Sequence, residues 1–176
     1  MRQCTKRIFC CAGAVLLCMG MLTGCGSKKK KQEKPLTGYA YKSRCQQINS
    51  WSKSIYTAAQ AAITDLDAED RDISSFVGDF KWSGSDFKEQ NPNGSVEELL
   101  RYRMSLYFTD IVKMQDVYIE FDEYSIVRGV AVKRTYQRTG QVFYGTYPQV
   151  ETVEIQEKLN STEDALYYAV NGELPS

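Results

Sequence analysis

The chain has 176 residues, of which 43% are hydrophobic and 25% are charged, a composition typical of a globular domain with an apolar core. It contains no histidine, which excludes Ser-His-Asp and Cys-His catalysis as well as histidine ligands to zinc. The net charge is zero, but the charges are segregated, because residues 25–44 carry +6 and residues 45–176 carry −9. A domain this acidic is not expected to bind nucleic acid.

The first element is a basic, then apolar, N-terminal segment. An apolar run over 8–22 ends in Leu22-Thr23-Gly24-Cys25, which resembles the lipobox of bacterial lipoprotein precursors. The resemblance implies a signal peptide over 1–24, cleavage between Gly24 and Cys25, and lipidation of the Cys25 thiol. The alternative is an uncleaved transmembrane helix, but a run of this length rises only about 22 Å, short of the roughly 30 Å hydrocarbon core.

Residues 25–44 form the expected tether. They are polar and show no apolar periodicity over most of their length, which indicates a disordered linker. Four lysines directly follow the lipidation site, where each basic residue gains about 1 kcal/mol near anionic headgroups; the alternative is a solvated spacer. They are Lys28, Lys29, Lys30 and Lys31. We therefore expect a lipid-anchored protein on the extracytoplasmic face of a cell membrane.

Cysteine placement excludes an intramolecular disulfide in the processed chain. Of the six cysteines, four lie in the segment to be removed and Cys25 would carry lipid, so that Cys45 alone remains. We expect Cys45 to be a small buried apolar residue rather than a reactive thiol.

The domain over 45–176 opens with the clearest helix pattern. Ile48, Trp51 and Ile55 begin an apolar stripe with three- and four-residue spacings, which continues to Leu66 and predicts a long amphipathic helix. The stretch 65–90 is acidic and then rich in glycine, serine and aromatic residues, which indicates short strands or loops.

Two shorter helices are predicted from their end signals. Ser95 and Glu98 have the spacing of a capping box, and the apolar face that follows them continues to Ile111. Ser161 can cap a last helix, which Gly172 would end.

Three strand-like runs lie between these helices. The runs 117–121 and 125–134 predict an antiparallel hairpin, and 141–147 predicts a third strand. The expected fold class is α+β, with a long N-terminal helix packed on a small antiparallel sheet and two shorter helices.

The globular part resembles type IV pilins and pseudopilins. The segments 54–65, 130–132 and 144–148 carry this resemblance as one half of a helix and two closing strands. It implies a non-enzymatic pilin-like domain for envelope assembly or adhesion, with other envelope proteins or cell-wall glycan as partners. A lipobox and a polar tether stand where a pilin has its apolar half-helix, so filament building is not expected.

Two further sites are candidates, and no catalytic residue is predicted. Carboxylates at alternate positions are similar to calcium loops, although the glycine and glutamate of an EF-hand loop are missing; the alternative is a solvated loop. They are Asp65, Asp67, Glu69 and Asp70. Trp82 is the best candidate for an exposed ring that stacks on a sugar, which makes a ligand- or glycan-binding lipoprotein with an aromatic patch the alternative function.

Overall fold

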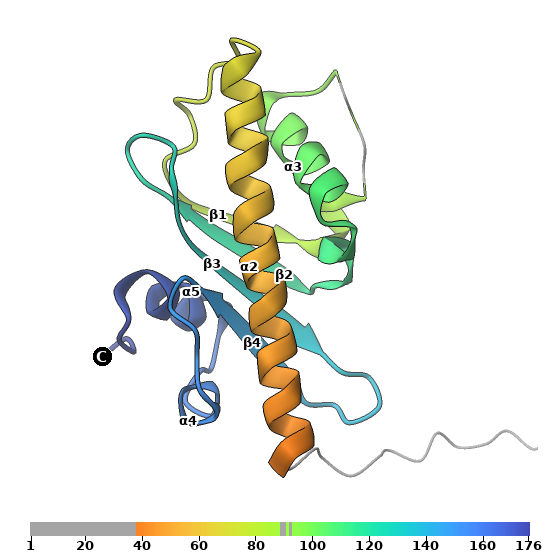
Figure 1. Ribbon diagram of the computed structural model, residues 1–176, viewed down its shortest axis with the longest axis vertical. Coiled ribbons are helices and arrows are strands. Elements are labelled where there is room, and N and C mark those ends of the chain that lie inside the picture. Colours follow the sequence, from red (N-terminus) through yellow and green to blue (C-terminus); the bar gives the residue numbers. More distant parts are fainter. Residues whose placement is uncertain (1–37, 89–90, 92) are drawn as a thin grey trace, which may run out of the picture. The chain divides into compact units, whose positions relative to one another are not determined.

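The computed structural model describes residues 38–88, 91 and 93–176, which fall within the structural unit Lys34–Ser176. These residues form a four-stranded antiparallel sheet with helices packed on both faces (Figure 1). This is the predicted α+β class, with the long helix first. In chain order the elements are α2 (Gly38–Ala68), β1 (Gly78–Ser83), η1 (Gly84–Phe87), α3 (Val96–Tyr107), η2 (Thr109–Lys113), β2 (Asp116–Phe121), β3 (Val127–Thr135), β4 (Val142–Tyr147), α4 (Val153–Gln156) and α5 (Thr162–Asn171).

The strand order β1-β2-β3-β4 follows the chain, so each strand pairs antiparallel with its neighbours in sequence. β2 and β3 form the hairpin predicted from 117–121 and 125–134, and β4 is the strand predicted over 141–147. The register shifts between Glu120 and Phe121, next to the hairpin turn.

α2 is a 31-residue helix that lies across one face of the sheet (Figure 1). Its stripe includes Ile48, Ile55 and Leu66, each with 0% exposure, in the same core cluster as Val130 of β3. Burying an aliphatic side chain of this size contributes roughly 1.5–3 kcal/mol, which makes this stripe the main attachment of the helix. The predicted helix is confirmed and ends at Ala68.

Gly145 allows β4 to approach α2 closely. A Cβ atom at this position would lie 2.5 Å from the Ile48 carbonyl oxygen and 2.5 Å from Ser52 Oγ. These two atoms are themselves hydrogen-bonded, because the Ser52 hydroxyl donates to the Ile48 carbonyl at 3.1 Å. The close contact brings Asn49 of α2 within hydrogen-bond distance of the β4 backbone.

α3 packs beside the C-terminal half of α2 (Figure 1). The predicted capping box is present, because Ser95 Oγ accepts from the Glu98 N–H and the Glu98 carboxylate accepts from the Ser95 N–H. The helix ends at Tyr107, earlier than its apolar pattern suggests. Ile111 is still fully buried, but in η2.

α5 covers the face of the sheet opposite α2. Side chains alternate along a strand, so that Ala131 of β3 clusters with Ala165 and Leu166 of α5, whereas Val130 belongs to the α2 side. Gly172 ends α5 in the left-handed region with φ 75°, as predicted.

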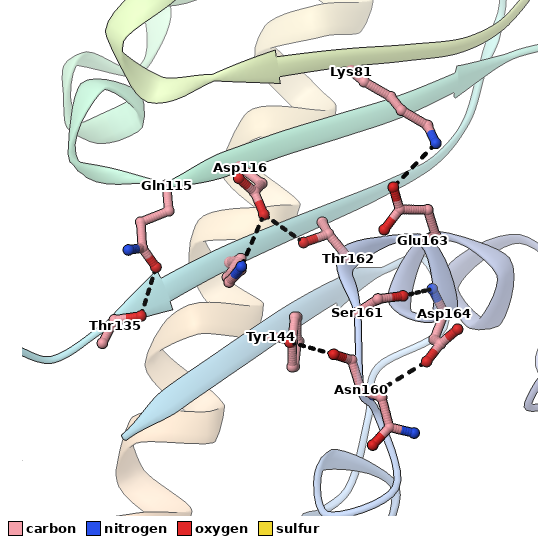
Figure 2. Close-up of polar contacts among 11 residues, drawn as sticks. Lys81, Gln115, Asp116, Thr135, Tyr144, Asn160, Ser161, Thr162, Glu163 and Asp164 are labelled. Atoms are coloured by element: carbon pink, nitrogen blue, oxygen red, sulfur yellow. Dashed lines mark hydrogen bonds and ion pairs between the residues drawn. The ribbon is translucent and has the colours of Figure 1, made fainter. Parts of the chain in front are cut away.

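Polar contacts attach the first turn of α5 to the sheet (Figure 2). Thr162 Oγ1 donates to Asp116 Oδ2 at 2.8 Å, and Lys81 pairs with Glu163 at 3.2 Å. The Ser161 hydroxyl accepts from the Asp164 N–H at 3.0 Å, which confirms the predicted cap.

Two local features differ from the predictions. α2 begins at Gly38, so residues 38–44 of the expected tether are helical; Tyr41 packs on the core and gives this polar stretch one apolar contact. α4 follows Thr152, whose hydroxyl caps it, in a stretch without a predicted element. A single turn is too short to leave a periodic pattern.

Candidate functional site

A pocket of about 550 Å³ lies between the N-terminal half of α2 and the segment 150–154 that follows β4. We call it the Glu151 pocket, after the most buried of its polar side chains. It is lined by Lys42, Cys45, Gln46, Asn49, Val150, Glu151, Thr152, Val153 and Glu154.

Glu151 is held by hydrogen bonds to β4 and α2. Thr146 Oγ1 donates to Glu151 Oε2 at 2.7 Å and accepts from the Glu151 N–H at 3.0 Å. Asn49 joins the same network, since its Oδ1 accepts from the Thr146 N–H at 3.0 Å and its Nδ2 donates to the Glu151 carbonyl at 3.2 Å. These bonds fix the position of the carboxyl group at the pocket wall.

One oxygen of this carboxyl group is left without a partner. Glu151 is only 3% exposed, and its Oε1 is a buried atom without a hydrogen-bond partner among the described residues. Burial raises the Glu151 pKa to about 8, although the hydrogen bond from Thr146 acts in the opposite direction. The carboxyl group is therefore protonated at neutral pH.

Cys45 stands in the wall of the same pocket and is 3% exposed, which confirms the predicted burial. Burial, together with the charge of Glu151, raises the Cys45 pKa to about 11. The sulfur is thus held as a thiol, and a thiol is a weak nucleophile. The pocket offers hydrogen bonding through Glu151 rather than covalent chemistry.

Trp82 does not present the exposed ring predicted from the sequence. The ring is 7% exposed, its Nε1 donates to Glu97 Oε1 at 2.7 Å, and its centroid lies 5.4 Å from that of Phe80 and 5.7 Å from that of Phe87. The aromatic residues between the turn formers pack on one another when β1 joins the sheet, so the indole is in the core. Trp51, by contrast, is only partly buried.

The predicted calcium carboxylates do not gather into one group. Arg103 pairs with both Asp65 at 3.5 Å and Glu69 at 2.6 Å, and the Tyr107 hydroxyl donates to Asp65. Within the ranges that the structure describes, no three His, Cys, Asp or Glu side chains are placed to hold a metal ion. The acidic stretch instead attaches α3 to the end of α2.

The lipidation site Cys25, the cleavage position Gly24 and the lysines at 28–31 lie outside the described residues. Among the helices in 38–88 and 93–176, none combines the length and apolar character needed to cross a membrane.

Glu151 and Asn49 were missed by the sequence reasoning. Asn49 offered a signal, because it is a polar residue within the apolar stripe of the long helix, one position after Ile48. Its partners on β4 and at Glu151 are about a hundred positions away, at a separation where no local pattern connects them.

No protein-family model, curated protein or solved structure matches this chain.

Proposed function

We propose that this chain is a lipid-anchored, extracytoplasmic binding protein that holds a small ligand in the Glu151 pocket. The unpartnered Glu151 Oε1 carries this proposal, because a buried polar atom without a partner costs free energy that a bound ligand can recover. The lipobox-like segment ending at Cys25 supports the anchor.

The ligand we propose is a small molecule with a primary amine. An ammonium group supplies the donor that Oε1 lacks, and it compensates the carboxylate that forms when Glu151 loses its proton. Glu154 adds a second negative charge to the lining, opposed by Lys42 alone. Binding therefore releases one proton near neutral pH.

A titration with small amines tests the ligand class. The chain from residue 25 onward, carrying Cys25→Ser, is titrated with ethanolamine, putrescine and glucosamine while backbone amide resonances are followed by NMR. We expect saturable shifts at Asn49 and 150–153 that disappear in Glu151→Gln and persist in Glu157→Gln, a matched change at an exposed carboxylate. Absence of saturable shifts with all three amines contradicts the proposed ligand.

Labelling with an alkyne fatty acid tests the anchor separately. Cells that express the full chain should incorporate the label into it, and Cys25→Ser should remove the label. Alanine at the four lysines 28–31 should weaken retention of the unlipidated protein on anionic vesicles if these residues are a second anchor. Unchanged labelling after Cys25→Ser would rule out this lipidation site.

A second candidate is a pilin-like domain that works in envelope assembly or adhesion. The observation that favours it is the long N-terminal helix packed on an antiparallel sheet. Its partners would be other envelope proteins or cell-wall glycan. Cross-linking in living cells followed by mass spectrometry tests this candidate: envelope proteins recovered at α2 support it, and recovery of no specific protein or glycan counts against it.

A further inference from the structure

Two arginines stack on aromatic rings where β3 meets α2. The Arg134 guanidinium lies 4.5 Å from the Trp51 ring centroid and 5.2 Å from that of Tyr136, and Arg44 lies 4.7 Å from the Tyr136 centroid. We call these four residues the arginine–aromatic cluster. The rings hold the guanidinium planes in place by cation–π contact, so little side-chain entropy remains to be lost on binding.

Neither arginine of this cluster forms an ion pair with a carboxylate of the described residues. The ion pairs in the described part of the chain use other cations, and the Arg44 side chain donates to the neutral Gln47 Oε1 at 2.7 Å. Within the described residues, the Nη1 atom of the Arg134 side chain is buried without a hydrogen-bond partner. A guanidinium has five N–H donors, and leaving them unused in a partly buried place is costly.

The cluster borders a cavity of about 320 Å³ with a strongly positive lining. Its walls are Lys113, Arg134, Thr135, Tyr136, Gln137 and Arg138. Of these residues, Lys113 pairs with Asp110 at 2.5 Å. Residues 45–176 carry a net charge of −9, yet three cationic side chains line this one cavity, namely Lys113, Arg134 and Arg138.

We propose that this cavity binds a phosphate group, with Arg134 as its main ligand. The planar fork of an arginine matches two oxygens of a phosphate, and two further cations in the lining, Lys113 and Arg138, compensate its charge. The site shares no lining residue with the Glu151 pocket and does not depend on an amine there. The phosphate can belong to a phospholipid headgroup or to a soluble phosphate ester.

Calorimetry on the full chain in neutral detergent micelles tests this site. Glycerol 3-phosphate and dihexanoyl phosphatidylglycerol are the probes, with dihexanoyl phosphatidylcholine as the zwitterionic comparison. We expect Arg134→Gln to weaken binding of the anionic probes at least tenfold, and Arg134→Lys to weaken it less. The matched control is Arg128→Gln on the same strand, because Arg128 is exposed and paired with Glu120 at 2.6 Å.

The two probes distinguish the source of the phosphate. Tighter binding of phosphatidylglycerol than of glycerol 3-phosphate identifies a lipid headgroup, and equal binding identifies a soluble ester. The proposal is overturned if Arg134→Gln and Arg128→Gln lose the same affinity. It is also overturned if neither anionic probe gives a binding heat at 10 mM. If Arg134→Gln does not fold, the double change Lys113→Gln with Arg138→Gln replaces it, and an unchanged affinity then overturns the site.

Discussion

Thr146 and Glu151 exchange two hydrogen bonds across the chain segment that follows β4. The Thr146 hydroxyl donates to Glu151 Oε2 and accepts from the Glu151 N–H, at 2.7 Å and 3.0 Å. This pairing occupies Oε2, so Oε1 is the carboxyl oxygen left to bind a ligand. The chemistry of the pocket therefore depends on whether Glu151 carries a proton.

The raised Glu151 pKa predicts that the domain becomes less stable as pH rises. The folded chain holds this proton up to about pH 8, whereas the unfolded chain releases it near the ordinary value of 4.5. The folded state thus binds more protons between these values, and the free energy of unfolding falls throughout that window. Each pKa unit corresponds to about 1.4 kcal/mol, so the fall is several kcal/mol.

Urea unfolding at pH 5, 6.5 and 8.5 measures the free energy of unfolding of wild type and of Glu151→Gln. The difference between the two proteins at each pH isolates the contribution of Glu151. The difference matters because carboxylates with lowered pKa values, such as Glu98, act in the opposite direction. Glu151→Gln should lose less stability from pH 5 to 8.5, whereas Glu154→Gln at an exposed position should follow wild type. If the free energies of unfolding of wild type and Glu151→Gln change with pH in parallel, the raised pKa of Glu151 is contradicted.

The close approach of β4 to α2 predicts that Gly145→Ala is strongly destabilising. The new methyl group meets the Ile48 backbone carbonyl at 2.5 Å, and a helix backbone cannot yield without shifting α2. Overpacking of this kind costs about 1–3 kcal/mol or more. Gly129→Ala is the comparison, since its nearest contact is a side-chain methyl of Val170 at 2.7 Å rather than a backbone carbonyl. Thermal unfolding measures both changes. A melting temperature that is lower for Gly129→Ala than for Gly145→Ala would contradict the close contact between β4 and α2.

The buried position of Trp82 predicts a folding role. Trp82→Ala should lower the free energy of unfolding by about 3–5 kcal/mol, because it opens a large cavity and leaves Glu97 without its indole donor. Tyr124→Ala, at a ring that is 72% exposed, should be nearly neutral. Chemical denaturation measures both changes, and a neutral Trp82→Ala would restore the exposed-ring interpretation.

The raised Cys45 pKa predicts slow reaction with thiol reagents. The folded chain, made from residue 25 with Cys25→Ser, should react with a disulfide reagent at pH 8 on the order of a hundredfold more slowly than the chain in guanidinium chloride. Burial and the Glu151 charge both suppress the thiolate. Equal rates in the two solvents would mean that the sulfur is open to solvent.

Much of the fold could be predicted because its signals are local. The stripe from Ile48 to Leu66, the Ser95 cap and the alternating strands around Val130 each lie within a few neighbouring residues. The start of α2 was placed too late, since the first turns have little apolar pattern and depend on Tyr41 meeting Phe143 from β4. Contacts across the chain decide such boundaries.

The candidate sites could not be predicted in the same way. Glu151 looks like one more carboxylate in a segment with several, and only tertiary packing places it against Asn49 and Thr146. Arg134 likewise meets Trp51 only when β3 crosses α2. The prediction for Trp82 was wrong because a local signal was misleading. The neighbouring glycine and serine suggested a loop, whereas the segment forms β1.

The most direct test of the central claim is an NMR titration of the Glu151 side-chain carboxyl carbon, with and without ethanolamine. We predict a pKa near 8 in the free protein and a lower pKa when the amine is bound, because the ammonium group favours the carboxylate. A pKa near 4.5 in the free protein, or a pKa that does not move at saturating ethanolamine, would contradict the account of this pocket.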